Sequence, residues 1–467
     1  MRWILFIAAG MSVAGCATHS PDPLTPDGMP SKFSESGNVS APVGWWEAFG
    51  DAGLNEVLAV ALADNFTLRA AWDRLAQAEA VARRQGAALR PEVDVLASGS
   101  RVRREDPAEG GAVYRNEFSA GLVAGYELDL WGRVRSARDA ARLDAAASAD
   151  QVQVAAITVA AEAATVWMQR AEQSEQVTLL RRQVDVGEKI LDVLQQRFRS
   201  GQSSAVDVWQ QEQLVEARRG DLAAAASRLA VLENQLRIFM GKPPGAPLAE
   251  ADGLPGLPPL PGAGVPADVL TRRPDIRRAW YQVLAADRRM AAAVADRFPR
   301  LSITGRLTTT EPRVEDLFSD WLASLAGNLV GPIVDGGMRR AEAARTEAAV
   351  SEALNLYRHA VLTALTEVEN ALVREQQQGE LVERLARQVQ LAGQVVDRTR
   401  EGYLRGNEDF LRVLTADLTW QNLERTRLVA NRELLEIRIG LYRALGGGLE
   451  LERPPAATLI TKKESPP

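Results

Sequence analysis

Residues 177–201 read VTLLRRQVDVGEKILDVLQQRFRSG, and this stretch decides the fold. Its apolar side chains recur at alternating steps of three and four residues, with Gly187 in the one gap: Val177, Leu180, Val184, Leu191, Leu194 and Phe198. A repeat of 3.5 residues keeps one stripe of a helix facing a partner helix, as in a coiled coil. The stretch therefore predicts a long helix that packs lengthwise against a neighbour and turns at Gly201.

The same pattern returns 205 residues later, where residues 382–406 read VERLARQVQLAGQVVDRTREGYLRG. Gly201 becomes Gly406, and no insertion separates the copies. The apolar positions of the next helix repeat at the same offset, Leu229, Leu232 and Leu236 becoming Leu434, Ile437 and Leu441. The chain is therefore predicted to be a tandem duplication of one long helical hairpin.

Proline placement predicts where the long helices lie. All 23 prolines fall outside two windows, 108–242 and 333–453, both rich in Ala and Leu. Proline inside a helix costs about 3 kcal/mol, so windows of this length indicate continuous helices. A helix over 135–200 would be roughly 100 Å long at 1.5 Å per residue.

A pair of alternating segments precedes each long helix. An Ala-rich helix is predicted over 54–90 and ends before Pro91; at an offset of 208, its counterpart ends before Pro299. The second segment of each pair, Phe118–Leu130 and Trp321–Leu329, places apolar residues on one face and small or polar residues on the other. Alternation over about ten residues is typical of a transmembrane β-barrel strand, although an ordinary half-buried hairpin gives the same pattern.

Composition excludes several classes of function. A net charge of -6 with interleaved charges does not fit a nucleic-acid-binding surface, which needs a basic patch. One Cys and two His leave no disulfide framework and no zinc set, so we expect no metal and no cofactor. No nucleophile elbow, P-loop or dinucleotide fingerprint occurs, so the chain is not expected to be an enzyme. No run of 18 apolar residues follows the N-terminus.

The N-terminus reads as an export signal. A short apolar run ends in Val13-Ala14-Gly15-Cys16, which resembles a bacterial lipobox, and the alternative is an ordinary signal peptide with a chance cysteine. The resemblance implies that Cys16 carries lipid. The predicted division is 1–15 signal peptide, 16–44 extended lipidated tether, 45–242 first repeat, 243–266 Pro/Gly linker, 267–450 second repeat, and 451–467 disordered tail.

Closure of the strands predicts an oligomer. Two strand pairs give four strands per chain, whereas membrane barrels start at eight strands and an open sheet edge cannot lie in lipid. Three chains would supply 3 × 4 = 12 strands. The predicted fold is thus mainly α with membrane β: long helical hairpins forming an α-barrel, and four strands per chain closing a 12-stranded barrel in a homotrimer.

The junction sequences resemble a known family. YELDLWGR at 126–133 and GPIVDGG at 331–337 are similar to the strand–helix junctions of TolC-like outer-membrane factors of tripartite efflux pumps, in the lipoprotein branch of OprM and NodT. FRSG at 198–201 and YLRG at 403–406 resemble the hairpin tips of that family, and RPDIR at 273–277 resembles the opening of its second repeat. The likeness covers nearly all of 45–447.

This resemblance implies a function, a location and partners. The chain would be a lipid-anchored, barrel-embedded channel-tunnel of the cell outer membrane that extends into the periplasm. It would passively export small molecules received from a periplasmic adaptor and an inner-membrane transporter. Two alternatives remain, namely a pump adaptor lipoprotein and a periplasmic coiled-coil scaffold without a pore. Adaptors carry one hairpin inserted in a β domain, whereas this chain has two at constant offset.

The candidate site residues follow from the same resemblance. Gly201 and Gly406 are expected at the hairpin-tip turns, because tight turns often need positive φ. Relatives often carry Asp nine positions after the second tip glycine, where this chain has Thr415. The side chains near the tips are either gate residues or solvated turn residues: Asp207, Glu408, Asp409, Arg412 and Thr415. The junctions contribute Trp131, Gly132, Arg133, Asp335, Gly336 and Gly337, and Trp131 and Trp321 are either interfacial belt residues or packing residues.

Overall fold

The computed structural model describes residues 32–37, 44–106, 111–251, 253–264, 266–446 and 449–453. The signal segment, Cys16 and the tail from residue 454 lie outside the described residues. The chain divides into two compact units, each of which takes segments from both halves of the sequence. Within the described residues, unit 1 comprises 75–148 and 278–359, and unit 2 comprises the remainder.

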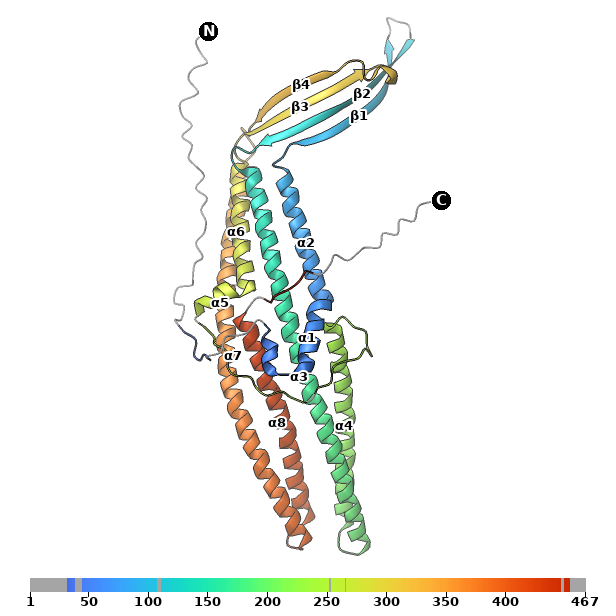
Figure 1. The fold of residues 1–467 in the computed structure, drawn as a ribbon, viewed down its shortest axis with the longest axis vertical. Helices are drawn as coiled ribbons and strands as arrows, with labels where there is room; N and C mark the ends of the chain where they lie inside the picture. The colour runs from blue at the N-terminus through green and yellow to red at the C-terminus, as the bar shows by residue number, and fades with distance from the viewer. Residues whose placement is uncertain are drawn as a thin grey trace. The chain divides into compact units, whose positions relative to one another are not determined.

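The predicted long hairpins are present. Helices α3 (Arg133–Arg199) and α7 (Met338–Leu404) are each 67 residues long, and they are followed by α4 (Ala205–Phe239) and α8 (Phe410–Leu445). In Figure 1, α4 runs beside the later half of α3, and α8 beside the later half of α7. The other helices are η1 (Trp45–Phe49), α1 (Ala52–Asp64), α2 (Phe66–Ala87), α5 (Pro266–Arg272), α6 (Pro274–Ala295) and η2 (Val314–Asp316). A mainly helical chain is confirmed.

The apolar seam of α3 holds the first hairpin together. Val177 and Leu180 are buried with Ala225 of α4, and Leu222 and Leu229 pack against this cluster. Burial of such side chains contributes about 25 cal/mol per Å² of apolar surface. The last predicted seam residue is an exception: Phe198 is 47% exposed, because it lies in the final turn of α3, beside the hairpin tip.

The helix predicted over 54–90 is broken at Asn65 into α1 and α2. The Asn65 Oδ1 accepts hydrogen bonds from the backbone N–H groups of Thr67 and Leu68, at 2.9 and 3.0 Å. Its amide Nδ2 donates to the carbonyl of Phe239 at 3.0 Å. An asparagine that bonds to the following N–H groups satisfies the free donors of a new helix, which is why the chain bends there.

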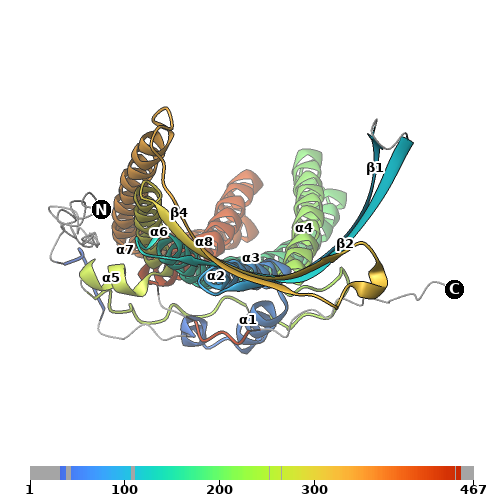
Figure 2. The same ribbon diagram turned by 90° about the horizontal axis from the view of Figure 1, so that it is seen from above.

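The strands form one antiparallel sheet in the order β1-β2-β3-β4. Its strands are β1 (Glu92–Asp106), β2 (Gly111–Leu128), β3 (Arg300–Glu311) and β4 (Leu322–Val330). The sheet is visibly curved in Figure 2. Among the described residues, no strand pairs with the outer edge of β1 or of β4. Each chain therefore presents two open sheet edges.

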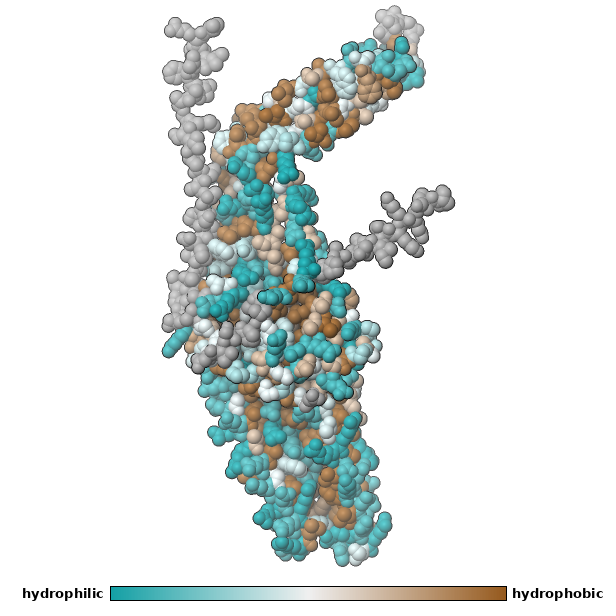
Figure 3. All heavy atoms as spheres, viewed as in Figure 1, coloured by the Kyte–Doolittle hydropathy of each residue, from teal (hydrophilic) through white to brown (hydrophobic). Residues whose placement is uncertain are grey.

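The register divides the sheet into two chemically different faces. Cross-strand rows on one face are apolar: Val93–Ala124–Gly305–Leu325 and Val95–Leu122–Leu307–Ala323. The other face is largely polar, and Ser98 and Ser119 share a hydrogen bond of 2.7 Å on it. Its larger apolar exceptions are Leu96, Val102, Val113, Val123, Leu322 and Val330. Apolar side chains gather over the strands in Figure 3. The face that carries the rows beginning with Val93 and Val95 is called the apolar face of the sheet.

Residues 32–37 are bonded to other segments of unit 2, in a region whose composition predicts an extended tether. Phe33 is buried, the Ser34 N–H donates to Glu369 at 3.1 Å, and the Gly37 N–H donates to the Pro261 carbonyl at 3.1 Å. A Cβ at position 37 would lie 1.8 Å from the Leu260 carbonyl oxygen. The close approach of the linker backbone therefore requires glycine at this position.

Candidate functional site

The first hairpin tip is a capped turn. Gly201 has a φ of +73°, and Ser204 caps α4 by accepting from the Asp207 N–H at 3.1 Å. The Asp207 carboxylate accepts in return from the Ser204 N–H at 3.0 Å and from the Ser203 hydroxyl at 2.9 Å. This reciprocal arrangement is a capping box. The carboxylate of Asp207 thus holds the turn together.

The second tip gathers three of the candidate gate residues. Gly406 has a φ of +78°, and Asp409 caps α8 by accepting from the Arg412 N–H at 2.8 Å. The Arg412 guanidinium donates to Glu408 at 2.9 Å. Thr415 lies one turn further along α8, where its hydroxyl donates to the Leu411 carbonyl at 2.8 Å. The structure brings Glu408, Asp409 and Arg412 together, and it places Asp207 in the other tip.

The two hairpins contact each other close to these tips. The Arg197 guanidinium of α3 lies over the Tyr403 ring of α7, 4.8 Å from the ring centroid, and Tyr403 packs edge-on against Phe410 of α8. A cation over an aromatic face gains about 0.5–1 kcal/mol at exposed sites. Sequence reasoning included Tyr403 in the tip motif YLRG but missed Arg197, which reads as a surface charge until the hairpins are packed.

A buried polar network joins the hairpins further from the tips. Arg218 of α4 donates to the Gln421 side chain at 2.9 Å, Gln421 donates to Asp417 at 2.7 Å, and Arg400 of α7 donates to Asp417 at 2.6 Å. Burial raises the pKa of the Asp417 carboxyl above its usual 3.8, and the Arg400 charge opposes part of that shift. These three hydrogen bonds link α4 to α7 and α8 and fix how α4 and α8 meet, although the buried Nε of Arg400 has no hydrogen-bond partner.

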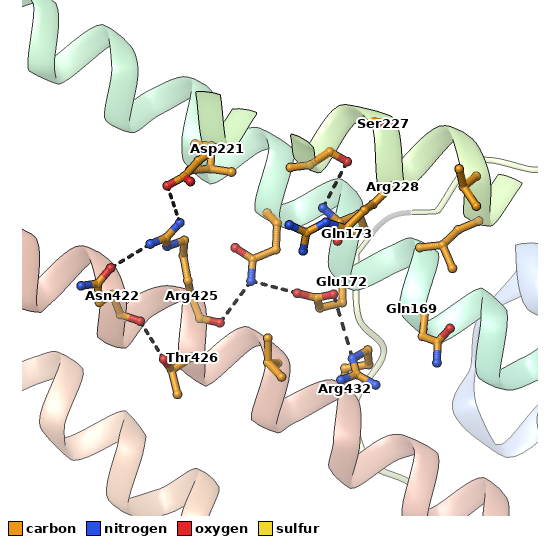
Figure 4. Close-up of a pocket in the computed structure, with 16 residues that line it drawn as sticks. Gln169, Glu172, Gln173, Asp221, Ser227, Arg228, Asn422, Arg425, Thr426 and Arg432 are labelled. Atoms are coloured by element: carbon orange, nitrogen blue, oxygen red, sulfur yellow. Dashed lines mark hydrogen bonds and ion pairs between the residues drawn. The ribbon is translucent and has the colours of Figure 1, made fainter. Parts of the chain in front are cut away.

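A cavity of about 780 Å³ lies among α3, α4 and α8, and all of its lining residues belong to unit 2. Figure 4 shows its polar lining. Arg425 donates to Asp221 at 3.0 Å, and the Gln176 amide donates both to the Arg425 carbonyl at 3.1 Å and to Glu172 at 2.8 Å. Arg432 lies 4.0 Å from the Glu172 carboxylate. The cavity is therefore lined by charges of both signs that are engaged with one another.

Replacing Glu172 with glutamine should stabilise the helical hairpins at pH 7. Burial raises the pKa of Glu172 above its usual 4.5, although Gln176 and Arg432 oppose the shift. The folded protein therefore binds this proton more tightly than the unfolded chain does. The protonated Glu172 carboxyl therefore contributes to the stability of the folded protein below about pH 4.5. This contribution is lost as the pH rises through the raised pKa of Glu172 in the folded protein. Chemical denaturation followed by circular dichroism should show a gain at pH 7 that shrinks towards pH 4.

The matched control for that prediction is Glu212→Gln, which makes the same chemical change at an exposed position on α4. This variant should leave the stability unchanged at both pH values. A Glu172→Gln protein that is less stable than the parent at pH 7 would show that the bond to Gln176 and the charge of Arg432 outweigh desolvation.

The first strand–helix junction is fixed by charged pairs. Arg133 binds the Glu127 carboxylate at 2.8 and 2.9 Å, and Asp129 accepts from the N–H groups of Val134 and Arg135 at 3.0 and 2.8 Å. The Asp129 carboxylate thus satisfies free donors in the first turn of α3. Gly132 has a φ of +75°, which lets the chain turn from the strand into the helix.

The second junction uses the same chemistry with different residues. The Asp335 carboxylate accepts from the Gly337 N–H at 3.0 Å and pairs with Arg339 at 3.2 Å, and Arg339 also pairs with Asp296 at 3.1 Å. Gly336 and Gly337 have φ values of +64° and +87°. The predicted junction residues therefore lie at the turns from β2 into α3 and from β4 into α7.

The two tryptophans have different surroundings. The Trp131 indole donates to the Pro299 carbonyl at 2.7 Å and stacks on Phe298, with ring centroids 4.9 Å apart. Trp321 precedes β4 at the other end of the sheet, is 49% exposed and packs against Phe318. Each tryptophan thus combines an aromatic neighbour with a partly exposed ring, and the belt and packing interpretations stay predictions for both.

Neither a metal centre nor a spanning helix is found in the described part of the chain. Within the described residues, no three His, Cys, Asp or Glu side chains are grouped so that they could bind a metal ion. None of the described helices has an apolar stretch long enough to cross a membrane.

Comparison with known proteins identifies the family. The sequence profile of the outer membrane efflux protein family matches residues 57–242 and 265–447. The chain belongs to the outer membrane efflux protein family. It is 31% identical to the pyoverdine export outer membrane protein OpmQ of Pseudomonas aeruginosa over 88% of both chains. It is 26% identical to the cation efflux system protein CusC of Escherichia coli K12, over 95% of this chain and 99% of CusC.

Solved structures of the family share the fold. The outer-membrane channel OprN matches with a TM-score of 0.85 and 25% identity, over 92% of this chain and 99% of OprN. The open state of the Neisseria gonorrhoeae MtrE outer membrane channel matches with a TM-score of 0.81 and 26% identity, over 91% and 97% of the two chains. As a member of this family, the protein is an efflux channel component of the outer membrane, and the family is not one of enzymes. These matches support the channel and not the adaptor or the scaffold.

Proposed function

We propose that three copies of this efflux protein close a channel-tunnel through which small molecules leave the cell unchanged. The single observation that carries the proposal is the four-stranded sheet with an exposed apolar face and two open edges. Unpaired backbone groups are not tolerated in lipid, so β1 of one copy must pair with β4 of the next. Three copies give 3 × 4 = 12 strands, an even number above the minimum for a membrane barrel.

The helical hairpins then serve as the periplasmic part of the duct. Their tips expose large apolar side chains: Phe198, Val206, Trp209, Leu404 and Leu411. Exposed apolar side chains at a hairpin tip are suited to a protein partner, and we assign them to a periplasmic adaptor that links the channel to an inner-membrane transporter. Glu408, Asp409, Arg412, Thr415 and Asp207 would lie at the entrance. Charged residues at a pore mouth select ions by sign.

Cys16 is proposed as the lipid attachment site, in the outer membrane beside the barrel. The acyl chains would add about 0.8 kcal/mol per buried CH₂ to anchoring. Relatives are named for cargoes as different as pyoverdine and cations. We propose that cargo selection rests with the transporter, so this chain conducts several classes of small molecule.

The mass of the detergent-solubilised full-length protein tests the proposal. We expect the mass of three chains after correction for bound detergent, and discrete conductance steps in a planar bilayer. The Cys16→Ser form should give the same mass and conductance, since the barrel and not the lipid closes the channel. A detergent-independent monomer without conductance would overturn the proposal and favour a scaffold.

A further inference from the structure

The β1–β2 hairpin extends beyond the rest of the sheet. Pairing of β2 with β3 ends where Phe118 lies opposite Glu311, whereas pairing of β1 with β2 continues to Asp106 and Gly111. We call residues 100–106 and 111–117 the overhang. The helices join the sheet at its opposite end, where β1 begins at Glu92 and β2 ends at Leu128. In the proposed channel, on which this inference rests, the overhang therefore lies at the outer leaflet.

The overhang changes the chemistry of the apolar face. Side chains alternate along a strand, so Arg101 and Arg103 continue the face that carries Val93 and Val95. Both arginines are exposed, and their cross-strand partners are Asn116 and Tyr114. The sheet has six arginines in its described strands, and these two are the ones on the apolar face. The other four lie on the opposite face: Arg104, Arg115, Arg300 and Arg306.

The arginine pair is oriented by its neighbours. The Arg101 guanidinium lies over the Tyr114 ring, 4.8 Å from the ring centroid, and Tyr114 is 56% exposed. Arg103 pairs with Glu105 at 3.1 Å, and both side chains remain largely exposed. Aromatic and arginine side chains next to an apolar band are the groups expected at a membrane–water interface. Arginine also binds phosphate oxygens through its planar fork of donors.

We propose that Arg101 and Arg103, braced by Tyr114, bind the phosphorylated headgroups of outer-leaflet lipid. In the proposed channel, lipid acyl chains would lie against the apolar rows of the sheet. Arg101 and Arg103 lie beyond these rows on the same face, at the level of the headgroup phosphates. The site is one-sided, because Arg300 at the helix end of the sheet and Arg306 midway along β3 both lie on the face that points away from lipid. The contact would fix the depth of the barrel in the membrane.

The test measures binding of bisphosphorylated lipid A to the full-length protein in detergent, with a fluorescent lipid as the probe. Arg101→Gln/Arg103→Gln should weaken binding by about tenfold or more, as expected for two basic residues at a charged surface. The matched control is Arg104→Gln/Arg115→Gln, which removes the same charge from the other face of the same overhang. It should stay within about twofold of the parent.

Two further arms identify the ligand. In the first arm, dephosphorylated lipid A should bind the parent protein weakly, with the affinity that bisphosphorylated lipid A has for the Arg101→Gln/Arg103→Gln protein. In the second arm, inorganic phosphate should not displace the labelled lipid. Equal loss in both double variants, or equal binding of phosphorylated and dephosphorylated lipid, would overturn the proposal. The mass and conductance of each variant are recorded in parallel. A failed lipid site in a conducting trimer is thereby distinguished from failure of the channel proposal itself.

Discussion

An arginine in place of Leu325 should prevent the chain from assembling in the outer membrane. Leu325 is 80% exposed in the single chain and stands in the apolar row Val93–Ala124–Gly305–Leu325. An arginine on the lipid side of a barrel strand costs about 2–4 kcal/mol near the midplane. In a trimer the penalty is incurred three times, so the loss of assembled protein should be close to complete. The measurement is the amount of trimer extracted from the outer-membrane fraction.

The adjacent residue provides the matched control. Ala326 is also exposed, but it pairs with Thr304 on the opposite, largely polar face of the sheet. Ala326→Arg introduces the same side chain at the same depth, and it should assemble normally while changing the single-channel conductance. If both variants assemble equally well, the apolar face does not lie against lipid. If both fail equally, the strand tolerates no arginine and the two faces are not distinguished by their surroundings.

The long hairpins could be predicted closely from the sequence. A helix expected over 135–200 is observed as Arg133–Arg199, because a long proline-free window with a continuous 3.5-residue pattern leaves no competing structure. Among the predicted seam residues of α3, only Phe198 is exposed, because it lies in the last turn of α3, before α4 begins. The break at Asn65 was missed because the surrounding residues are all compatible with a helix, although an asparagine between two helical runs is itself a capping signal.

The strands were harder to delimit. Residues 92–98 alternate clearly, but β1 continues to Asp106 through a stretch, GSRVRRED, in which arginines occupy both faces. Hydrophobic periodicity cannot detect such a segment, because its side chains project into a polar layer on each side. The capping box of Ser204 and Asp207, in contrast, was readable from the spacing of the two residues. Sequence reasoning treated Asp207 as either a gate residue or a solvated turn residue and overlooked its capping role.

The contacts between hairpins could not be predicted from either repeat alone. Arg218 and Gln421 are ordinary polar residues in helical sequence, and they become partners only because α4 and α8 pack side by side. Their sequence separation of 203 residues carries no local signal. Arg438 is the extreme case, since its side chain is 2% exposed although arginine is almost always a surface residue.

Replacing Arg438 with methionine should destabilise the helical part by about 3–5 kcal/mol, the cost typical of breaking a buried ion pair. Arg438 of α8 binds both carboxylate oxygens of Glu375 of α7, at 2.5 and 2.7 Å, and its other nitrogen donates to the carbonyls of Pro258 and Pro259 in the linker. The Glu375 side chain is only 12% exposed. Methionine would fill much of the volume but leave that carboxylate buried without its counter-charge.

Guanidinium unfolding followed by circular dichroism at 222 nm measures the effect. Arg398→Met removes the arginine of an ion pair with Glu401 on the same helix α7, and because Arg398 is 85% exposed it should cost less than about 1 kcal/mol. Adding Glu375→Leu to Arg438→Met should recover most of the lost stability, since replacing both charges with apolar groups leaves no buried carboxylate. If the double variant does not recover stability, the lost stability comes from the hydrogen bonds between Arg438 and the linker carbonyls of Pro258 and Pro259. A loss below 1 kcal/mol for Arg438→Met alone would show that water reaches Glu375 once the arginine is gone, and that the ion pair does not hold α7, α8 and the linker together.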